Sequence, residues 1–446
     1  MSAIARRVRS ASVLWALCAQ FFLSIPRDVR AQDLSAPERK TMQAMLRGVR
    51  KEIEERYYDS TFGGLNFQAA YDSADARIQS ARALVGALAA IAWFTLELHD
   101  SHTFFVPPQQ TVGVEYGWAM SMVGDSCFVR YVAPESDAER QGVHAGDQVL
   151  AVNGFAPTRE NLWQINYLFH LLRPQRALHT TLRAPGASPR EIDIASTVRE
   201  RTKIMDLTGA DGGRDIGRLI RDGEKHLDDY RAETIEYGDR VLVWKMPTFV
   251  IPLDDVRDAI KRARRQKALV LDLRGNGGGY VAVMLELVKQ LSRDSVIVGS
   301  LHERRKTTPM VAKGGRDDAF VGDVYVLVDS RSASASEILA RTVQLTKRGT
   351  VVGDRTAGAV MQAESRFSTL GIETKILYGA QVTNADIIMS DGARLEHVGV
   401  TPDELLLPSS TDLAAGRDVV LARALTLAGV PTDPTKAGQL YSRSSR

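Results

Sequence analysis

The chain has 446 residues, enough for two or three domains, and its 44% hydrophobic and 25% charged residues are typical of a globular protein. It carries 57 Lys and Arg against 54 Asp and Glu, and five of the arginines lie within the first 31 positions. Without those positions 52 basic and 53 acidic side chains remain, so the charge gives no basis for nucleic-acid binding.

Residues 1–31 predict a secretory signal peptide. Three early arginines precede an apolar run at 11–25, and small residues follow at Val29 and Ala31, the positions that a signal peptidase reads. The run is too short for a membrane span, so no stable span is expected once the signal is removed. Only Cys127 remains after it, so no intramolecular disulfide can form. We therefore expect a periplasmic or extracytoplasmic protein, and the sequence leaves its oligomeric state open.

Residues 35–105 predict an N-terminal helical region. Apolar side chains recur at helical spacing between Met42 and Ile53, and a second helical run covers about 81–98. The run Leu98-His-Asp-Ser-His-Thr-Phe-Phe105 then offers Ser101 and His102 in a polar turn before an extended aromatic stretch. A histidine in such a turn is a candidate general base.

Residues 113–200 change to short β-type runs with an Asn153-Gly154 hairpin signal. The phrase Gly142-Val-His-Ala-Gly-Asp147, followed by Val152-Asn-Gly, resembles a PDZ domain. In that family, backbone amides of a loop before a strand hold the C-terminal carboxylate of a peptide. The resemblance implies a peptide-binding loop at Tyr116, Gly117, Trp118 and Ala119. The alternative is a small β-domain that serves only as a spacer.

The rest of the chain predicts an α/β fold. Residues 201–238 read as a linker with one or two helices, and apolar strands alternate with helices over 239–408. A C-terminal helix is expected within 409–430 and a disordered tail at 431–446. The buried-type strands at 268–273 and 324–328 each lead into a turn rich in glycine or serine, where ligands of α/β sheets gather.

The first turn is Asp272-Leu-Arg-Gly-Asn-Gly-Gly-Gly279. It is neither a Walker loop nor a dinucleotide fingerprint, because no Gly-Lys-Ser/Thr follows and Tyr280 replaces the last glycine. Successive glycines before a helix let backbone N–H groups face an anion, which includes a transient oxyanion. A purely structural turn is the alternative.

The second turn is Ser330-Arg-Ser-Ala-Ser-Ala-Ser-Glu337. Ser334 with Glu337 three residues later fits a capping box, which requires no catalytic role. The same geometry suits a nucleophile, because the helix dipole favours developing negative charge and the N–H of Ala335 can help bind it.

These two turns, together with Val398-Gly-Val-Thr-Pro-Asp403, resemble the tail-specific (carboxy-terminal processing) serine peptidase family. The resemblance implies a crotonase-like α/β spiral core, preceded by a helical region and an inserted PDZ-like β-rich domain. It implies that Ser334 is the nucleophile. The oxyanion donors would be Gly277, Gly278 and Ala335.

The sequence departs from the better-known branch of this family at one position, Ala359. The better-known members use a lysine base that would fall on Ala359, and alanine cannot accept a proton. The other branch resembles the tricorn core protease and retinoid-binding protein repeats, with a Ser-His-Ser-Glu tetrad. On that pattern His102 is the base, and Ser101 and Glu396 orient it. Two other histidines compete less well for this role, His99 and His397.

We therefore predict an exported serine-type endopeptidase that cleaves peptides or unfolded chains through an acyl-enzyme at Ser334. No cofactor is implied, and no metal, because there is no His-Glu-x-x-His phrase or cysteine cluster. The alternative is a catalytically inactive member of the fold that binds peptide C-termini or apolar ligands.

Overall fold

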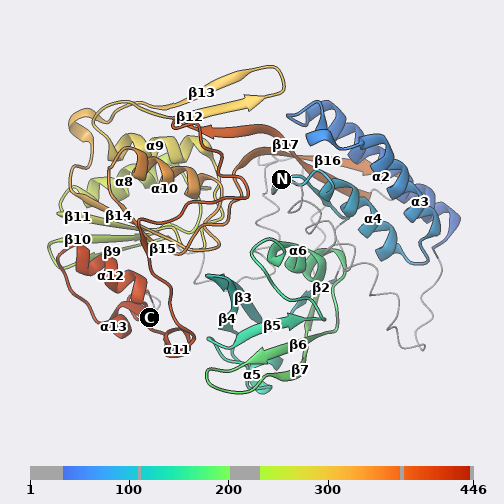
Figure 1. The fold of residues 1–446 in the computed structure, drawn as a ribbon, viewed down its shortest axis with the longest axis horizontal. Coiled ribbons are helices and arrows are strands. Elements are labelled where there is room, and N and C mark those ends of the chain that lie inside the picture. The colour runs from blue at the N-terminus through green and yellow to red at the C-terminus, as the bar shows by residue number, and fades with distance from the viewer. Residues whose placement is uncertain (1–33, 109–111, 201–231, 372–375, 442–446) are drawn as a thin grey trace, which may run out of the picture.

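The computed structural model describes residues 34–108, 112–200, 232–371 and 376–441. The expected signal peptide (1–31) and most of the expected linker (201–238) lie outside the described residues. Figure 1 shows the described chain as an α/β body, a smaller β-domain below it, and a group of N-terminal helices beside a second sheet.

The main sheet has six strands in the order β18-β15-β14-β11-β10-β9. All neighbours in it are parallel except the edge pair β9 and β10. The strands are β9 (Glu233–Tyr237), β10 (Val241–Lys245), β11 (Ala268–Asp272), β14 (Asp323–Val328), β15 (Thr350–Gly353) and β18 (Glu404–Leu405). Strand β9 occupies the end of the segment expected to be a linker.

Both faces of this sheet are buried, which explains the continuous apolar runs in its strands. Leu269 and Leu271 of β11 pack with the helices of one face, and Val270 packs on the opposite face with the C-terminal helix. The helices of the first face are α8 (Leu253–Ala263), α9 (Val281–Leu291) and α10 (Ala335–Leu345), and the second face is covered by α12 (Val419–Leu427).

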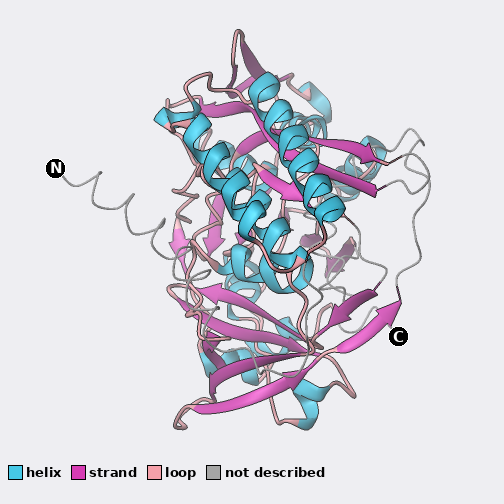
Figure 2. Ribbon diagram, turned by 90° about the vertical axis from the view of Figure 1, so that its right-hand side faces the viewer, coloured by secondary structure: helices cyan, strands magenta, loops and turns pink. Residues whose placement is uncertain are grey.

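A second sheet connects the core to the N-terminal helices. Its order is β1-β17-β12-β13, and β16 pairs with β17. The strands are β1 (Phe104–Val106), β12 (Val296–Glu303), β13 (Thr307–Ala312), β16 (Met361–Leu370) and β17 (Ile376–Met389). Helices α2 (Ala36–Arg56), α3 (Phe67–Ser80) and α4 (Leu84–Leu96) share one apolar cluster with β1 and β17. Seen from their own side, these helices lie in front of the sheet (Figure 2).

The third part is an antiparallel β-domain with its own apolar core. Its strands run in the order β3 (Trp118–Val123), β4 (Ser126–Val132), β5 (Gln148–Val152), β6 (Ala177–Arg183) and β7 (Arg190–Ala195), with helices α5 (Asp137–Arg140) and α6 (Leu162–Tyr167), a π-helical turn η3 (Leu168–Leu172), and the connecting pair β2 (Val112–Glu115) and β8 (Thr197–Glu200). The Asn153-Gly154 turn is present, with positive φ at both residues.

The C-terminal region differs from the expectation. The helix expected within 409–430 is two helices, α11 (Ser410–Ala414) and α12, separated at Gly416, whose φ is 63°. The expected disordered tail from 431 forms helix α13 (Pro434–Gly438) and packs on the sheet. Ala437 is fully buried there, because the apolar second face of the sheet needs this cover.

Short 3-10 turns occur at η2 (Phe62–Gly64) and η4 (Arg316–Asp318). Among the described residues, no helix combines the length and apolar character needed to cross a membrane. That same part of the chain contains no group of three or more His, Cys, Asp or Glu side chains placed to hold a metal ion.

The burial of the second sheet face predicts a large cost for truncating helix α12. Leu425 is fully buried, so Leu425→Ala should lower the free energy of unfolding by about 2–5 kcal/mol through lost contacts and a cavity. The matched control Leu405→Ala removes a side chain that is 61% exposed, and should change it by less than about 0.5 kcal/mol. Equal effects in chemical denaturation would contradict this packing.

Candidate active site

The turn that carries His102 is anchored at both ends. It follows helix α4, leads into β1, and β1 pairs with β17. The buried carboxylate of Asp100 accepts hydrogen bonds from the backbone N–H groups of His102 (2.9 Å) and Thr103 (2.6 Å). The hydroxyl of Thr383 on β17 donates to the same oxygen at 2.7 Å. The orientation of the histidine backbone is therefore fixed by the second sheet.

Ser101, His102 and Glu396 form a hydrogen-bonded relay. Ser101 Oγ lies 2.7 Å from His102 Nδ1 and donates to Glu396 Oε2 at 2.9 Å. The backbone N–H of Ser101 donates to Glu396 Oε1 at 2.7 Å, and that of Val360 donates to Oε2 at 2.7 Å. The predicted Ser-His pair and the predicted glutamate, far apart in sequence, are thus in contact.

The relay also determines the tautomer of His102. A hydroxyl has one hydrogen, and Ser101 gives it to a carboxylate that can only accept. Ser101 Oγ must therefore accept from His102 Nδ1–H, which leaves Nε2 of the neutral ring without a proton. A ring in this state can take up a proton at Nε2.

Ser334 precedes helix α10 with φ 56° and ψ −117°, a conformation that is strained for a residue with a Cβ. Its N–H is shared between the carbonyl oxygen of Ala359 (2.9 Å) and Glu337 Oε2 (3.0 Å). The reach of Glu337 back to the Ser334 N–H is one half of the predicted capping box. Ser334 Oγ faces the Glu337 N–H as in a capping box, but this N–H donates to the Ser334 carbonyl oxygen at 2.9 Å, and Oγ makes no side-chain cap hydrogen bond.

The glycine turn lies directly against Ser334. A Cβ placed on Gly278 would be 2.7 Å from Ser334 Cβ, and the φ of Gly278 is 95°, so only glycine fits. The N–H of Gly278 donates to Asn276 Oδ1 at 2.8 Å. In the described part of the chain, the N–H groups of Gly277 and Ala335 have no hydrogen-bond acceptor. These two donors are thus unoccupied beside the serine.

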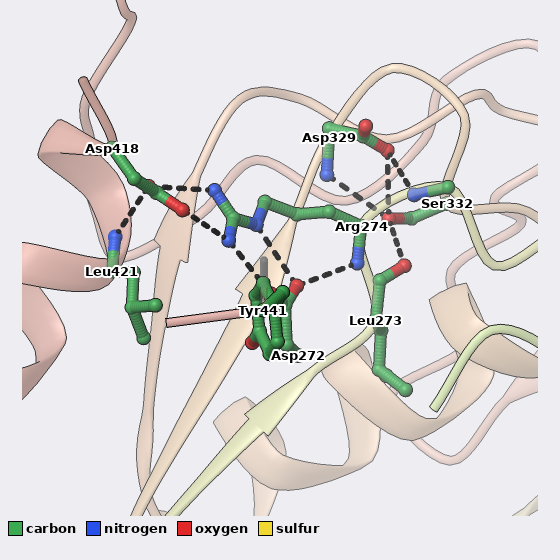
Figure 3. Close-up of polar contacts among 9 residues, drawn as sticks. Asp272, Leu273, Arg274, Asp329, Ser332, Asp418, Leu421 and Tyr441 are labelled. Atoms are coloured by element: carbon green, nitrogen blue, oxygen red, sulfur yellow. Dashed lines mark hydrogen bonds and ion pairs between the residues drawn. The ribbon is translucent and has the colours of Figure 1, made fainter. Parts of the chain in front are cut away.

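Hydrogen bonds join the glycine turn (272–279) to the serine turn (330–337) near the strand ends from which they start. Ser332 Oγ donates to the carbonyl oxygen of Leu273 at 2.8 Å, and the carboxylate of Asp329 accepts from the N–H of Gly275 at 2.9 Å. Arg274 lies between Asp272 and Asp418, with guanidinium-to-carboxylate distances of 2.6 and 2.8 Å (Figure 3). This arginine holds the pKa of the buried Asp272 carboxyl below its usual range, against the opposing effect of burial.

The C-terminal segment after helix α13 also supports the start of the glycine turn. The hydroxyl of Tyr441 donates to Asp272 Oδ2 at 2.8 Å, and the ring lies under the Lys245 ammonium, 4.9 Å from its centre (Figure 3 shows the tyrosine). Burial raises the pKa of Tyr441 well above its usual value. The segment expected to be disordered therefore supports the strand end from which the glycine turn begins.

The peptide units of Ala359 and Val360 join the serine turn to the histidine turn. Ala359 accepts from the Ser334 N–H, and the next N–H, of Val360, donates to Glu396. Within the described residues no direct hydrogen bond links Ser334 and His102. The two other candidate histidines contact each other: His397 Nε2 lies 2.8 Å from the carbonyl oxygen of His99.

The expected peptide-binding loop lies at the start of β3, but its groove is narrow. The Tyr116 hydroxyl is buried, donating to the carbonyl of Phe169 at 3.0 Å and accepting from the N–H of Gln175 at 2.9 Å. Gly117 has a φ of 72°. The cavity between β3 and helix α6 has about 20 Å³ and is lined by residues that include Trp118 and Ala119. Such a volume holds about one water molecule, and no peptide side chain.

The β-domain contacts the core at two places, at Asp354 directly after β15 and at Ser330 of the serine turn. Arg159 pairs with Asp354 at 2.6 Å, and both side chains are at most 10% exposed. The Ser330 hydroxyl donates to the carbonyl oxygen of Met122 on β3 at 2.6 Å. Ser330 lies four positions before Ser334, so the β-domain is in contact with the serine turn itself.

Comparison with known proteins gives a family match over the segment that contains both the glycine turn and the serine turn. Residues 240–406 match the model of peptidase family S41. The chain is 24% identical over 324 residues to a tail-specific protease of Haemophilus influenzae, covering 68% of this chain and 43% of that relative. It is 30% identical over 298 residues to a carboxyl-terminal-processing protease of Synechocystis sp., covering 66% of this chain and 62% of the relative. The chain thus spans less than two thirds of the length of these two relatives.

Among solved structures, mature CPAF complexed with lactacystin matches with a TM-score of 0.63 at 15% identity, covering 91% of this chain and 99% of that one. This likeness extends the common fold beyond the matched segment. This segment of the chain matches peptidase family S41, as the motifs indicated.

The relay predicts the proton position on His102. In the wild type at a pH where the ring is neutral, its ¹⁵N chemical shifts should report Nδ1–H, and Ser101→Ala should weaken this preference because the acceptor is gone. The exposed His179, which pairs with Asp193 at 2.8 Å, serves as the internal control and should not change. A wild-type His102 with its proton on Nε2 would contradict the relay.

Proposed function

We propose that this protein is an exported serine-type endopeptidase that cleaves peptides or unfolded chains. Ser334 is the nucleophile, His102 is its base, and Ser101 and Glu396 orient the ring. The observation that carries the proposal is the Glu396–Ser101–His102 relay, joined to the Ser334 turn through Ala359 and Val360. The match of residues 240–406 to peptidase family S41 supports the reaction type, and His102 in the relay is the base that Ala359 cannot be.

In this proposal Ser334 Oγ bonds to the scissile carbonyl carbon while its proton passes to His102 Nε2. The tetrahedral intermediate collapses as the carbon–nitrogen bond breaks, and the leaving amine takes that proton. Water then hydrolyses the acyl-enzyme by the same route and returns Ser334 to its starting state. Glu396 stabilises the charged ring through Ser101 and keeps its own proton state unchanged.

The oxyanion is bound by backbone N–H groups beside Ser334. Ala335 is the first residue of α10, so its N–H points out of the helix end and adds the favourable dipole. Gly277 supplies a second free N–H. Gly278 can join them when its bond to Asn276 Oδ1 opens. Two or three such donors account for much of the rate enhancement in acyl transfer.

The β-domain acts as a PDZ-like module, and the core as a crotonase-like spiral. The β3 edge strand, the Asn-Gly turn and the loop at Tyr116–Ala119 support the first assignment. Since the groove has about 20 Å³, a peptide could enter it only after Trp118 and helix α6 move apart. The printed names of the relatives, tail-specific and carboxyl-terminal-processing, favour substrates recognised near a chain end.

A fluorophosphonate probe tests the nucleophile. Ser334 Oγ should bond to the phosphorus with loss of fluoride, so wild type should be labelled and Ser334→Ala should not. His102→Ala should lower the labelling rate by at least about a hundredfold, in keeping with the loss of a general base. Cleavage of unfolded casein should fall in parallel, whereas a change at the exposed His179 of β6, His179→Ala, should stay within about threefold of wild type, because this histidine pairs with Asp193 and not with the relay.

Labelling that survives Ser334→Ala would refute the nucleophile assignment. A wild type that folds but neither reacts with the probe nor cleaves casein would support the inactive binding protein in place of the peptidase. Gly278→Ala provides a geometric check, because its Cβ would collide with Ser334 at 2.7 Å and should abolish labelling. The control Gly86→Ala meets only ordinary contact at 3.7 Å and should label normally.

A further inference from the structure

Glu337 is a fully buried carboxylate with an unusual set of partners. It is 0% exposed on helix α10, and none of the ion pairs found in the described residues involves it. Its oxygens accept four hydrogen bonds, and the donors and distances are Thr356 Oγ1 (2.6 Å), Gly358 N (2.7 Å), Ala359 N (2.9 Å) and Ser334 N (3.0 Å). An isolated buried charge is costly unless it is fully hydrogen-bonded, and here both oxygens are satisfied.

A capping box explains only one of these bonds. The bond to the Ser334 N–H lies within the helix start, three positions away. The other three come from a loop 19 to 22 positions further along the chain. A residue that served only to begin helix α10 would not need them. The carboxylate therefore joins the serine turn to the loop that contains Ala359.

We propose that Glu337 is a positioning residue of the active site, a role that rests on the proposed function and specifies how its nucleophile is held. It fixes the strained backbone of Ser334 from one side. From the other side it fixes Ala359, whose neighbour Val360 holds Glu396. Glu337 thus sets the distance between the nucleophile turn and the histidine relay, and it contacts no substrate.

The ionised form of Glu337 is the form that suits this role. Burial raises its pKa to about 7, although the four hydrogen bonds lower it. The groups that face it are the Thr356 hydroxyl and three backbone N–H groups. The other titrating groups of the site, Glu396 and His102, lie beyond Val360 and Ser101. A proton on Glu337 would point an O–H at donors, so at least one of the four bonds would break below that pKa.

The test uses Glu337→Gln, which preserves size but places an NH2 group against N–H donors. The maximal rate of fluorophosphonate labelling at pH 8 should fall about ten- to a hundredfold, the loss expected when charged hydrogen bonds that hold a reacting group are removed. The concentration of probe at half-maximal rate should change less than threefold, because Glu337 does not touch the probe. When the labelling rate is plotted against pH, its decline toward acidic pH should also become less steep, because one titrating group is gone.

A matched pair makes the result independent of folding problems with Glu337→Gln. Thr356→Val removes one of the four donors and should slow labelling, whereas Thr356→Ser retains the hydroxyl and should restore most of the rate. Circular dichroism and thermal melting identify the folded variants.

A folded Glu337→Gln protein that labels like wild type would overturn the proposal, and so would equal rates for Thr356→Val and Thr356→Ser. Either result leaves the peptidase assignment intact if Ser334→Ala still fails to label. Labelling of Ser334→Ala would refute the peptidase assignment first.

Discussion

Two adjacent peptide units, those of Ala359 and Val360, carry the contact on which the site depends. The Ala359 carbonyl oxygen accepts a hydrogen bond from the Ser334 N–H, and the Ala359 N–H donates to Glu337. The Val360 N–H donates to Glu396. All three interactions use backbone groups. The side chain at 359 is therefore free to be alanine, and the loss of a lysine there does not disturb the geometry. In the proposed function the proton acceptor is His102, in the turn between helix α4 and β1.

The main sheet provides the rigid base for this contact. Strands β11 and β14 are parallel neighbours, so the turns that follow them leave the same edge of the sheet. Arg274 and its two carboxylates hold one turn, and Ser332 links it to the other. Burial on both faces leaves the strand ends little freedom to shift. The close approach of Gly278 to Ser334 requires such rigidity, because it leaves no room for an added atom.

Local sequence pattern was sufficient to predict many of the strands, helices and turns. The apolar strands at 268–273 and 324–328, the helices after them and the Asn153-Gly154 turn are visible in sequence because each depends on neighbouring residues. The pairing of Ser101-His102 with Glu396 came from motif resemblance, and the relay brings those three residues into contact. Long-range contacts were not predictable. Tyr441 lies in a segment of polar composition, and its partner Asp272 is 169 positions away, so no local pattern predicts the contact.

The long-range contacts of Glu337 within the site were likewise not predictable from the sequence. Its spacing from Ser334 predicts a helix cap, and that contact is present, but its three loop partners become neighbours only in the folded chain. The strained φ of Ser334 and the narrow groove beside Trp118 also follow from tertiary packing. Side-chain type and spacing thus indicate which residues can react, whereas the fold determines how they are held.

A crystal structure of the wild-type protein would test whether His102 is the base of Ser334. We predict that His102 Nε2 lies within hydrogen-bond reach of Ser334 Oγ, about 2.6–3.5 Å, or is joined to it through one water molecule. A separation well above about 6 Å in a well-ordered site, or another side chain between the two atoms, would contradict it.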